Sequence, residues 1–151
     1  MANQHVWSDV VRGNVTVSGF DPVWHVANGI EPGPRELIEN AIRFVGRCEG
    51  TGLTVSLSCY YSFERPGTPV ELLDGLGTFT VNGQGRRPMP GCPDRIHIVE
   101  PGSRLVRGLT DDELSRWGCS VHQALDSYPS AYSAVAIEMK SGLAVIIARE
   151  G

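Results

Sequence analysis

The chain has 151 residues, of which 41% are hydrophobic and 20% are charged, and its formal net charge is −4. This length and composition predict one globular domain over residues 1–151, of a kind ordinary among soluble proteins. An acidic chain argues against nucleic-acid binding, and no apolar run approaches the roughly 20 residues of a membrane helix.

The first seven residues, Met-Ala-Asn-Gln-His-Val-Trp, have neither the cationic segment nor the apolar stretch of a signal peptide. We therefore expect a cytoplasmic protein in which all four cysteines stay reduced: Cys48, Cys59, Cys92 and Cys119. Two disulfides are the alternative if the chain is exported. The spacing contains no Cys-x-x-Cys pair, and Cys119-x-x-His122 alone lacks two of the ligands of a zinc site, so neither metal nor cofactor is predicted.

The first half of the chain begins with two short segments, 6–11 and 14–18, which we interpret as strands. A helix follows over residues 34–45, where Pro34 suits the first turn and apolar residues recur at helical spacing. Glu39 and Arg43 stand four apart in the favourable order, and Gly46 suits the end of the helix.

Residues 53–64 alternate strictly between apolar and polar side chains, from Leu53 and Thr54 to Phe63 and Glu64. A period of two over this length predicts a long strand with one face on a core and the other face, rich in hydroxyl groups, open to solvent. Such a half-buried strand is typical of an antiparallel sheet.

Shorter elements follow. Residues 68–75 fit either a capped helical turn or another strand, and both alternatives stay open. Residues 77–81 and 95–99 are interpreted as short strands on either side of a loop rich in glycine and proline.

A second main helix is expected over residues 110–127. Thr110 and Glu113 form a capping box, and Asp111 and Asp112 add negative charge at the end where the helix dipole favours it. Pro129 marks a point where this helix has already ended.

The chain closes with residues 134–139 and 143–149, whose apolar runs flank a Lys-Ser-Gly turn and predict a hairpin. Together these elements predict an α+β fold, in which a mostly antiparallel sheet carries two main helices on one face.

The predicted helix 110–127 would place Ser115, Cys119, His122 and Asp126 on its flank and far side. A thiol, an imidazole and a carboxylate are the groups used in nucleophilic catalysis. Neighbouring turns of one helix rarely reach the geometry that catalysis needs, so an ordinary polar helix face is the alternative.

A second candidate site is the loop 82–93, where glycines precede Arg86 and Arg87. Backbone N–H groups and two guanidinium groups could bind a phosphate or a carboxylate there. No phosphate-loop or dinucleotide-binding motif is present, and Asn82-Gly83 also fits a simple tight turn.

Four further residues are candidates for catalysis or ligand binding. His97 points away from its apolar strand neighbours and could act as a base with Asp94 or Glu100, although a purely structural histidine is the alternative. Trp24 and His25 could line a ligand pocket or belong to a turn and the core. Tyr60 lies on the polar face of the predicted long strand, which could bind a polar ligand or a partner chain.

These features favour a small binding protein that recognises a partner or a small anionic ligand through the polar sheet face and the arginine-bearing loop. The alternative is a cofactor-independent enzyme in which His97 or His122 is the base, Asp94 or Asp126 orients it, and Arg86 or Arg87 fixes an acidic substrate. No nucleic-acid or membrane partner is expected, and a homo-oligomer remains open, because a cysteine on the far face of a helix suggests that a subunit covers it.

Overall fold

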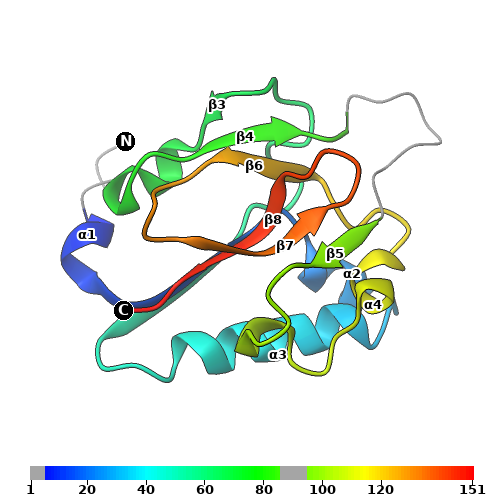
Figure 1. Cartoon of the computed structure of the whole chain (residues 1–151), viewed down its shortest axis with the longest axis horizontal. Coiled ribbons are helices and arrows are strands. Elements are labelled where there is room, and N and C mark those ends of the chain that lie inside the picture. Colours follow the sequence, from blue (N-terminus) through cyan, green and yellow to red (C-terminus); the bar gives the residue numbers. More distant parts are fainter. Residues whose placement is uncertain (1–5, 86–94) are drawn as a thin grey trace.

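The structure is a computed structural model that describes residues 6–85 and 95–151. In these ranges the elements follow one another as α1 (Val6–Val10), β1 (Val11–Ser18), α2 (Pro22–Ala27), α3 (Gly33–Val45), β2 (Thr51–Ser56), β3 (Thr68–Pro69), the 3-10 helix η1 (Glu71–Leu76), β4 (Thr80–Gly83), β5 (Ile96–Ile98), the 3-10 helix η2 (Arg104–Val106), α4 (Asp111–Ser115), β6 (Gln123–Ser127), β7 (Ser133–Glu138) and β8 (Ala144–Arg149) (Figure 1).

The strands form one curled sheet in the order β2-β1-β8-β6-β4-β3, and β7 joins β8 to β5 (Figure 1). Every pair is antiparallel except β1 with β2. The predicted α+β class and mostly antiparallel sheet are therefore confirmed. The parallel pair arises because α2 and α3 connect β1 to β2, and a parallel connection needs such a crossover.

The predicted helix over residues 34–45 is confirmed as α3, which runs along one side of the sheet (Figure 1). It is the one long helix of the described residues, since α4 has 5 residues and α3 has 13. The second main helix of the prediction is therefore missing.

The predicted helix 110–127 is wrong beyond its first turn. Its capping box forms as expected, with Glu113 N–H donating to Thr110 Oγ1 and the Glu113 carboxylate accepting from Thr110 N–H. The helix ends at Ser115, and Gly118 then adopts a φ of 79°, which a right-handed helix does not contain. Residues 123–127 become β6, in which Ala124 packs into one core and Leu125 into the other.

The predicted strand 53–64 is also too long. The strand β2 ends at Ser56, and the N–H of Leu57 makes the last sheet bond, to Ser18 O. Ser58 then takes a φ of 50°, so the chain leaves the extended conformation and turns. Tyr60 therefore lies in a turn after β2 and is absent from the strand face.

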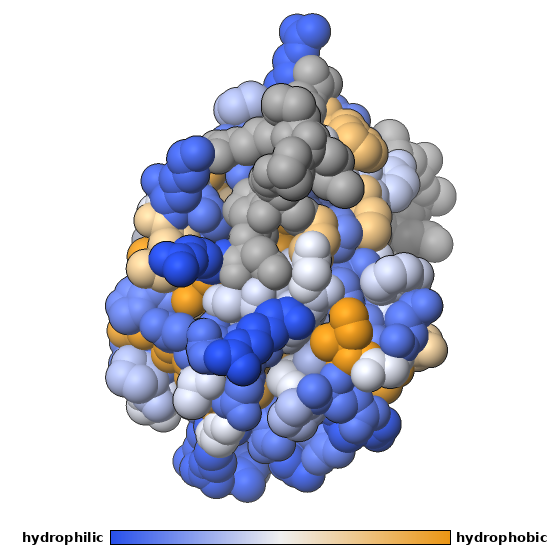
Figure 2. All heavy atoms as spheres, turned by 90° about the vertical axis from the view of Figure 1, so that its right-hand side faces the viewer, coloured by the Kyte–Doolittle hydropathy of each residue, from blue (hydrophilic) through white to orange (hydrophobic). Residues whose placement is uncertain are grey.

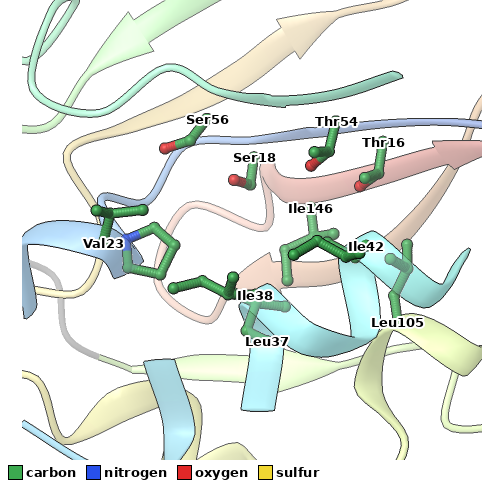
Figure 3. A pocket seen from close by; sticks show the side chains of 12 residues that line it. Thr16, Ser18, Val23, Leu37, Ile38, Ile42, Thr54, Ser56, Leu105 and Ile146 are labelled. Carbon is green, nitrogen blue, oxygen red and sulfur yellow. The ribbon is translucent and has the colours of Figure 1, made fainter. Parts of the chain in front are cut away.

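Within β2 the predicted alternation is confirmed, since Thr54 and Ser56 are exposed while Leu53 and Val55 are partly buried. This hydroxyl face lies on the side of the sheet that carries α3. The register places Thr16 opposite Thr54 and Ser18 opposite Ser56. These four side chains form one wall of a cavity of about 220 Å³, and apolar side chains from α2 and α3 form the other (Figure 3). The apolar face of β1 and β2 packs into a second core on the opposite side.

The remaining short elements agree in part with the prediction. Segment 14–18 lies within β1, segment 95–99 contains β5, and β7 with β8 forms the predicted hairpin. Segment 77–81 overlaps β4, and segment 68–75 combines both alternatives as β3 and η1. Segment 6–11 is mostly the helix α1, so a strand there is wrong except at Val11.

Two cores stabilise this arrangement. The first lies between α3, η2, α4 and the sheet and includes Phe20, Leu105 and Trp117. The second lies against η1 and includes Phe79 and Ile147. No helix of the described residues is both long enough and apolar enough to cross a membrane.

Candidate metal centre

Two of the candidate ligands lie at the start of α2. Pro22 begins this helix with the fixed φ that suits a first helical position, so Asp21 occupies the N-cap. An N-cap aspartate normally accepts a hydrogen bond from a helix N–H, yet the Asp21 side chain makes no such bond. His25 follows one turn later on the same side, and its Nε2 lies 2.9 Å from Asp21 Oδ1.

The third ligand comes from the loop that precedes β6. His122 N–H donates to Gly19 O at 3.2 Å, and its carbonyl accepts from Gln84 N–H at 2.8 Å. These backbone bonds fix the histidine beside the loop that follows β1. As a result His122 Nε2 also lies 2.9 Å from Asp21 Oδ1.

Asp21, His25 and His122 form a candidate metal centre, which we call the metal centre. Their ligand atoms all lie within 4.8 Å of one another. Ligand atoms around one Zn²⁺, at bond lengths of about 2.0–2.2 Å, lie roughly 3–4 Å apart. The three ligand atoms are therefore nearly as close together as ligands of one ion are.

Asp21 and His25 are both buried, and His25 is the more deeply buried of the two. Its side chain is 2% exposed, and neither ring nitrogen makes a hydrogen bond within the described residues. The Nε2 approach to Asp21 is close in distance but lacks hydrogen-bond geometry. Because buried polar groups nearly always have a partner, an imidazole of this kind is suited to bind a metal ion.

Cys59 lies beside the metal centre, in the turn that follows β2. Its Sγ is 3.5 Å from Asp21 Oδ2 and 3.8 Å from His122 Nε2. Burial, followed by the charge and hydrogen bonding of Asp21, raises the pKa of the Cys59 thiol. A thiol in this state is a poor nucleophile, but a metal cation would reverse the electrostatic balance.

The buried Gln123 joins the loops that carry these groups. Its Nε2 donates to Gly19 O at 2.9 Å and to Ser58 O at 2.7 Å. Gly19 lies two residues before Asp21, and Ser58 lies directly before Cys59. Gln123 thereby sets the distance between the loop after β1 and the turn after β2.

The geometry does not match a cysteine-histidine-aspartate catalytic triad. In such a triad the carboxylate binds one ring nitrogen and the nucleophile faces the other. Here Asp21 and Cys59 both approach Nε2 of His122. Convergence of several groups on one point is typical of ligands around a metal ion.

Two tryptophan rings pack against His25: Trp117 is buried, and Trp24 is largely exposed. The His25 ring centroid lies 5.3 Å from that of Trp117 and 5.0 Å from that of Trp24. Figure 2 shows the side of the molecule on which α2 and α4 lie, where outside the grey atoms hydrophilic residues dominate. A buried apolar ring beside the centre strengthens electrostatic contacts there.

The predicted helix-face constellation is not formed. Cys119 is disulfide-bonded, so its sulfur is not a free thiol, and the expectation of four reduced cysteines fails at this position. Cys48 and Cys59 are free. Asp126 lies in β6 and accepts from Gly67 N–H, while Ser115 Oγ accepts from Ile96 N–H.

His97 has a different carboxylate partner from those expected. Its Nδ1 lies 2.9 Å from Asp111 Oδ2, and both side chains are about half exposed. The hydrogen bond from His97, aided by the N–H of Ile98, lowers the pKa of Asp111. The other expected partner, Glu100, makes no hydrogen bond or ion pair with His97 among the described contacts.

Among the other predicted ligand residues, Trp24 lies beside the metal centre, where its ring packs against His25. Arg86, Arg87 and Asp94 lie outside the described residues. Tyr60 and Trp24 are 83% and 57% exposed, and Tyr60 packs its ring against Tyr61.

Sequence reasoning missed Asp21 and Cys59 and did not connect His25 with His122. One local signal was available, since Asp21 and His25 stand one helical turn apart behind a helix-starting proline. The other two positions lie far along the chain, so only the fold brings them together.

No protein-family model matches this chain, and neither a curated protein nor a solved structure does. The site is therefore argued from its geometry.

Proposed function

We propose that this protein binds one divalent transition-metal ion, with Zn²⁺ as the best fit, at Asp21, His25 and His122. The single observation that carries the proposal is the buried imidazole of His25, which lacks a hydrogen-bond partner among the described residues beside two further ligand groups. A bound ion would satisfy His25 and neutralise the buried carboxylate of Asp21.

The ligand types favour a metal of intermediate softness. Two imidazoles and a carboxylate suit Zn²⁺ or Co²⁺, whereas Mg²⁺ and Ca²⁺ prefer oxygen ligands alone. The Cys59 thiolate would complete a tetrahedron, because its sulfur already lies within 4 Å of both Asp21 and His122. Four protein ligands are typical of a metal that stabilises a fold, and we assign that role here.

The test is a titration of the metal-free protein with Co²⁺, which substitutes for Zn²⁺ and gives visible absorption bands in a tetrahedral site. We expect saturation at one ion per chain and a near-ultraviolet band from the bond between cobalt and the Cys59 sulfur. His25→Gln should weaken binding by more than the roughly 10–100-fold that loss of an outer-shell partner causes, because it removes a ligand of the metal itself.

Two matched variants serve as controls. His97→Gln removes a histidine outside the centre and should leave the titration unchanged. Cys59→Ser should remove the sulfur band, while Cys48→Ser, which alters the other free thiol of the residues that the structure describes, should keep it. Absence of saturable Co²⁺ binding by a folded protein would overturn the proposal, as would equal binding by His25→Gln.

A further inference from the structure

A hollow lined by four arginines lies between α3 and η2, and it is separate from the metal centre. It has a volume of about 60 Å³ and is lined by Arg43, Arg47, Arg104 and Arg107 together with Asn40 and Phe44. We propose that this hollow binds a small doubly charged oxyanion, such as a phosphate group.

The charge of the hollow is largely unbalanced. Arg43 pairs with Glu39 at 2.6 Å. Within the described residues, Arg47, Arg104 and Arg107 make no ion pair with a carboxylate. Like charges held close together repel one another, and the chain as a whole is acidic, with a net charge of −4. An anion bound among the guanidinium groups would remove this repulsion.

The backbone beneath the arginines is fixed. Asn40 is 4% exposed, and its Nδ2 donates to Arg107 O at 2.8 Å, which ties α3 to the end of η2. Leu105 and Val106 anchor η2 in the core beneath. The arginine side chains therefore project from two elements whose separation is set before any ligand arrives, which reduces the cost of binding.

The chemistry of the lining defines the ligand. Guanidinium groups donate paired hydrogen bonds in a plane, which suits the oxygens of phosphate or of a carboxylate. A hollow of this size holds a compact group, and the surplus of positive charge favours a dianion over a monoanion. The hollow contains no acidic lining residue that would favour a cation.

The experiment titrates the purified protein with inorganic phosphate at constant ionic strength, followed by backbone amide NMR shifts. We expect saturable shifts at α3 and η2, and Arg104→Gln or Arg107→Gln should each weaken binding on the order of tenfold. The matched control is Arg35→Gln, which removes the same charge from the other end of α3, where Arg35 pairs with Glu31. It should change the affinity little.

Stability supplies a second readout. Arg47→Gln with Arg104→Gln should leave the phosphate-free protein at least as stable as the parent, because repulsion is relieved, and should abolish the rise in Tm that phosphate causes. Non-saturable shifts, or equal weakening by Arg35→Gln, would overturn the proposal. Co²⁺ binding should be unchanged in these variants, so this proposal and the metal proposal can fail separately.

Discussion

His122 Nε2 lies 2.9 Å from Asp21 Oδ1, although 101 positions separate the two residues in the chain. The contact joins the loop after the first strand to the loop before β6, so it forms only when most of the sheet has assembled. Metal binding at this point and folding of the chain should therefore be linked.

Zinc should stabilise the native protein. At a free metal concentration of about 100 times Kd, a ligand specific to the native state contributes about 2.7 kcal/mol and raises Tm by several degrees. Thermal unfolding followed by circular dichroism, with zinc and then with EDTA, measures this shift. His25→Gln should remove the shift, and a parent protein whose Tm ignores zinc would contradict the linkage.

Gln123 should matter to both stability and metal affinity. Gln123→Ala removes the two bonds to Gly19 O and Ser58 O and leaves a cavity in a fully buried position, at a cost of about 2–4 kcal/mol. Denaturant unfolding gives the stability, and the Co²⁺ titration gives the affinity. Gln123→Met keeps the volume without the donors, so if it behaves like the parent protein, the hydrogen bonds are unimportant.

Gly19 should tolerate no side chain. A Cβ atom there would lie 1.8 Å from Gln123 O, so either the loop after β1 or the start of β6 would have to move. We expect Gly19→Ala to destabilise the fold by more than about 3 kcal/mol or to prevent its formation. Gly102→Ala, at a position with open space, is the control and should be nearly neutral in the same unfolding measurement.

Asp111 should contribute to the pH dependence of stability. Its pKa is lowered in the folded protein by the His97 hydrogen bond and by Ile98 N–H, so the ionised form is favoured on folding. This stabilisation is present above the ordinary pKa of 3.8 and is lost as the pH falls through the lowered value. The residue is 48% exposed, so the effect should be below about 1 kcal/mol.

The measurement is the free energy of unfolding between about pH 6 and pH 3 for the parent and Asp111→Asn. The parent should lose more stability than the variant over this range. An equal loss in both proteins would show that other carboxylates account for the acid sensitivity.

Local patterns predicted those elements whose signals do not depend on distant contacts. The helix α3 predicted from its apolar spacing, the capping box of Thr110 and the final hairpin are all present. The helix prediction over residues 123–127 is wrong because the apolar residues there fit a helical stripe as well as a buried strand. Packing against β4 and β8 decides between them, and that packing is a property of the whole fold.

The candidate site was less accessible to sequence reasoning. The sequence predicts His25 and His122 as candidate site residues, but it does not predict their shared neighbour Asp21 as one. The parallel pairing of β1 and β2 brings the segments after these strands, with Asp21 and Cys59, to one end of the sheet. A mostly antiparallel prediction does not contain that pairing.

The two ends of the sheet path differ in their resistance to association with other molecules. At one end, β3 has 2 residues and closes with Pro69, which cannot donate a hydrogen bond to a further strand. At the other end, β2 runs for 6 residues, Thr51–Ser56, without a charge or a proline. In concentrated or partly unfolded samples, a strand of another molecule should therefore add to the sheet next to β2. Such pairing would slow hydrogen exchange of the β2 backbone amides when the protein aggregates, which exchange experiments would detect.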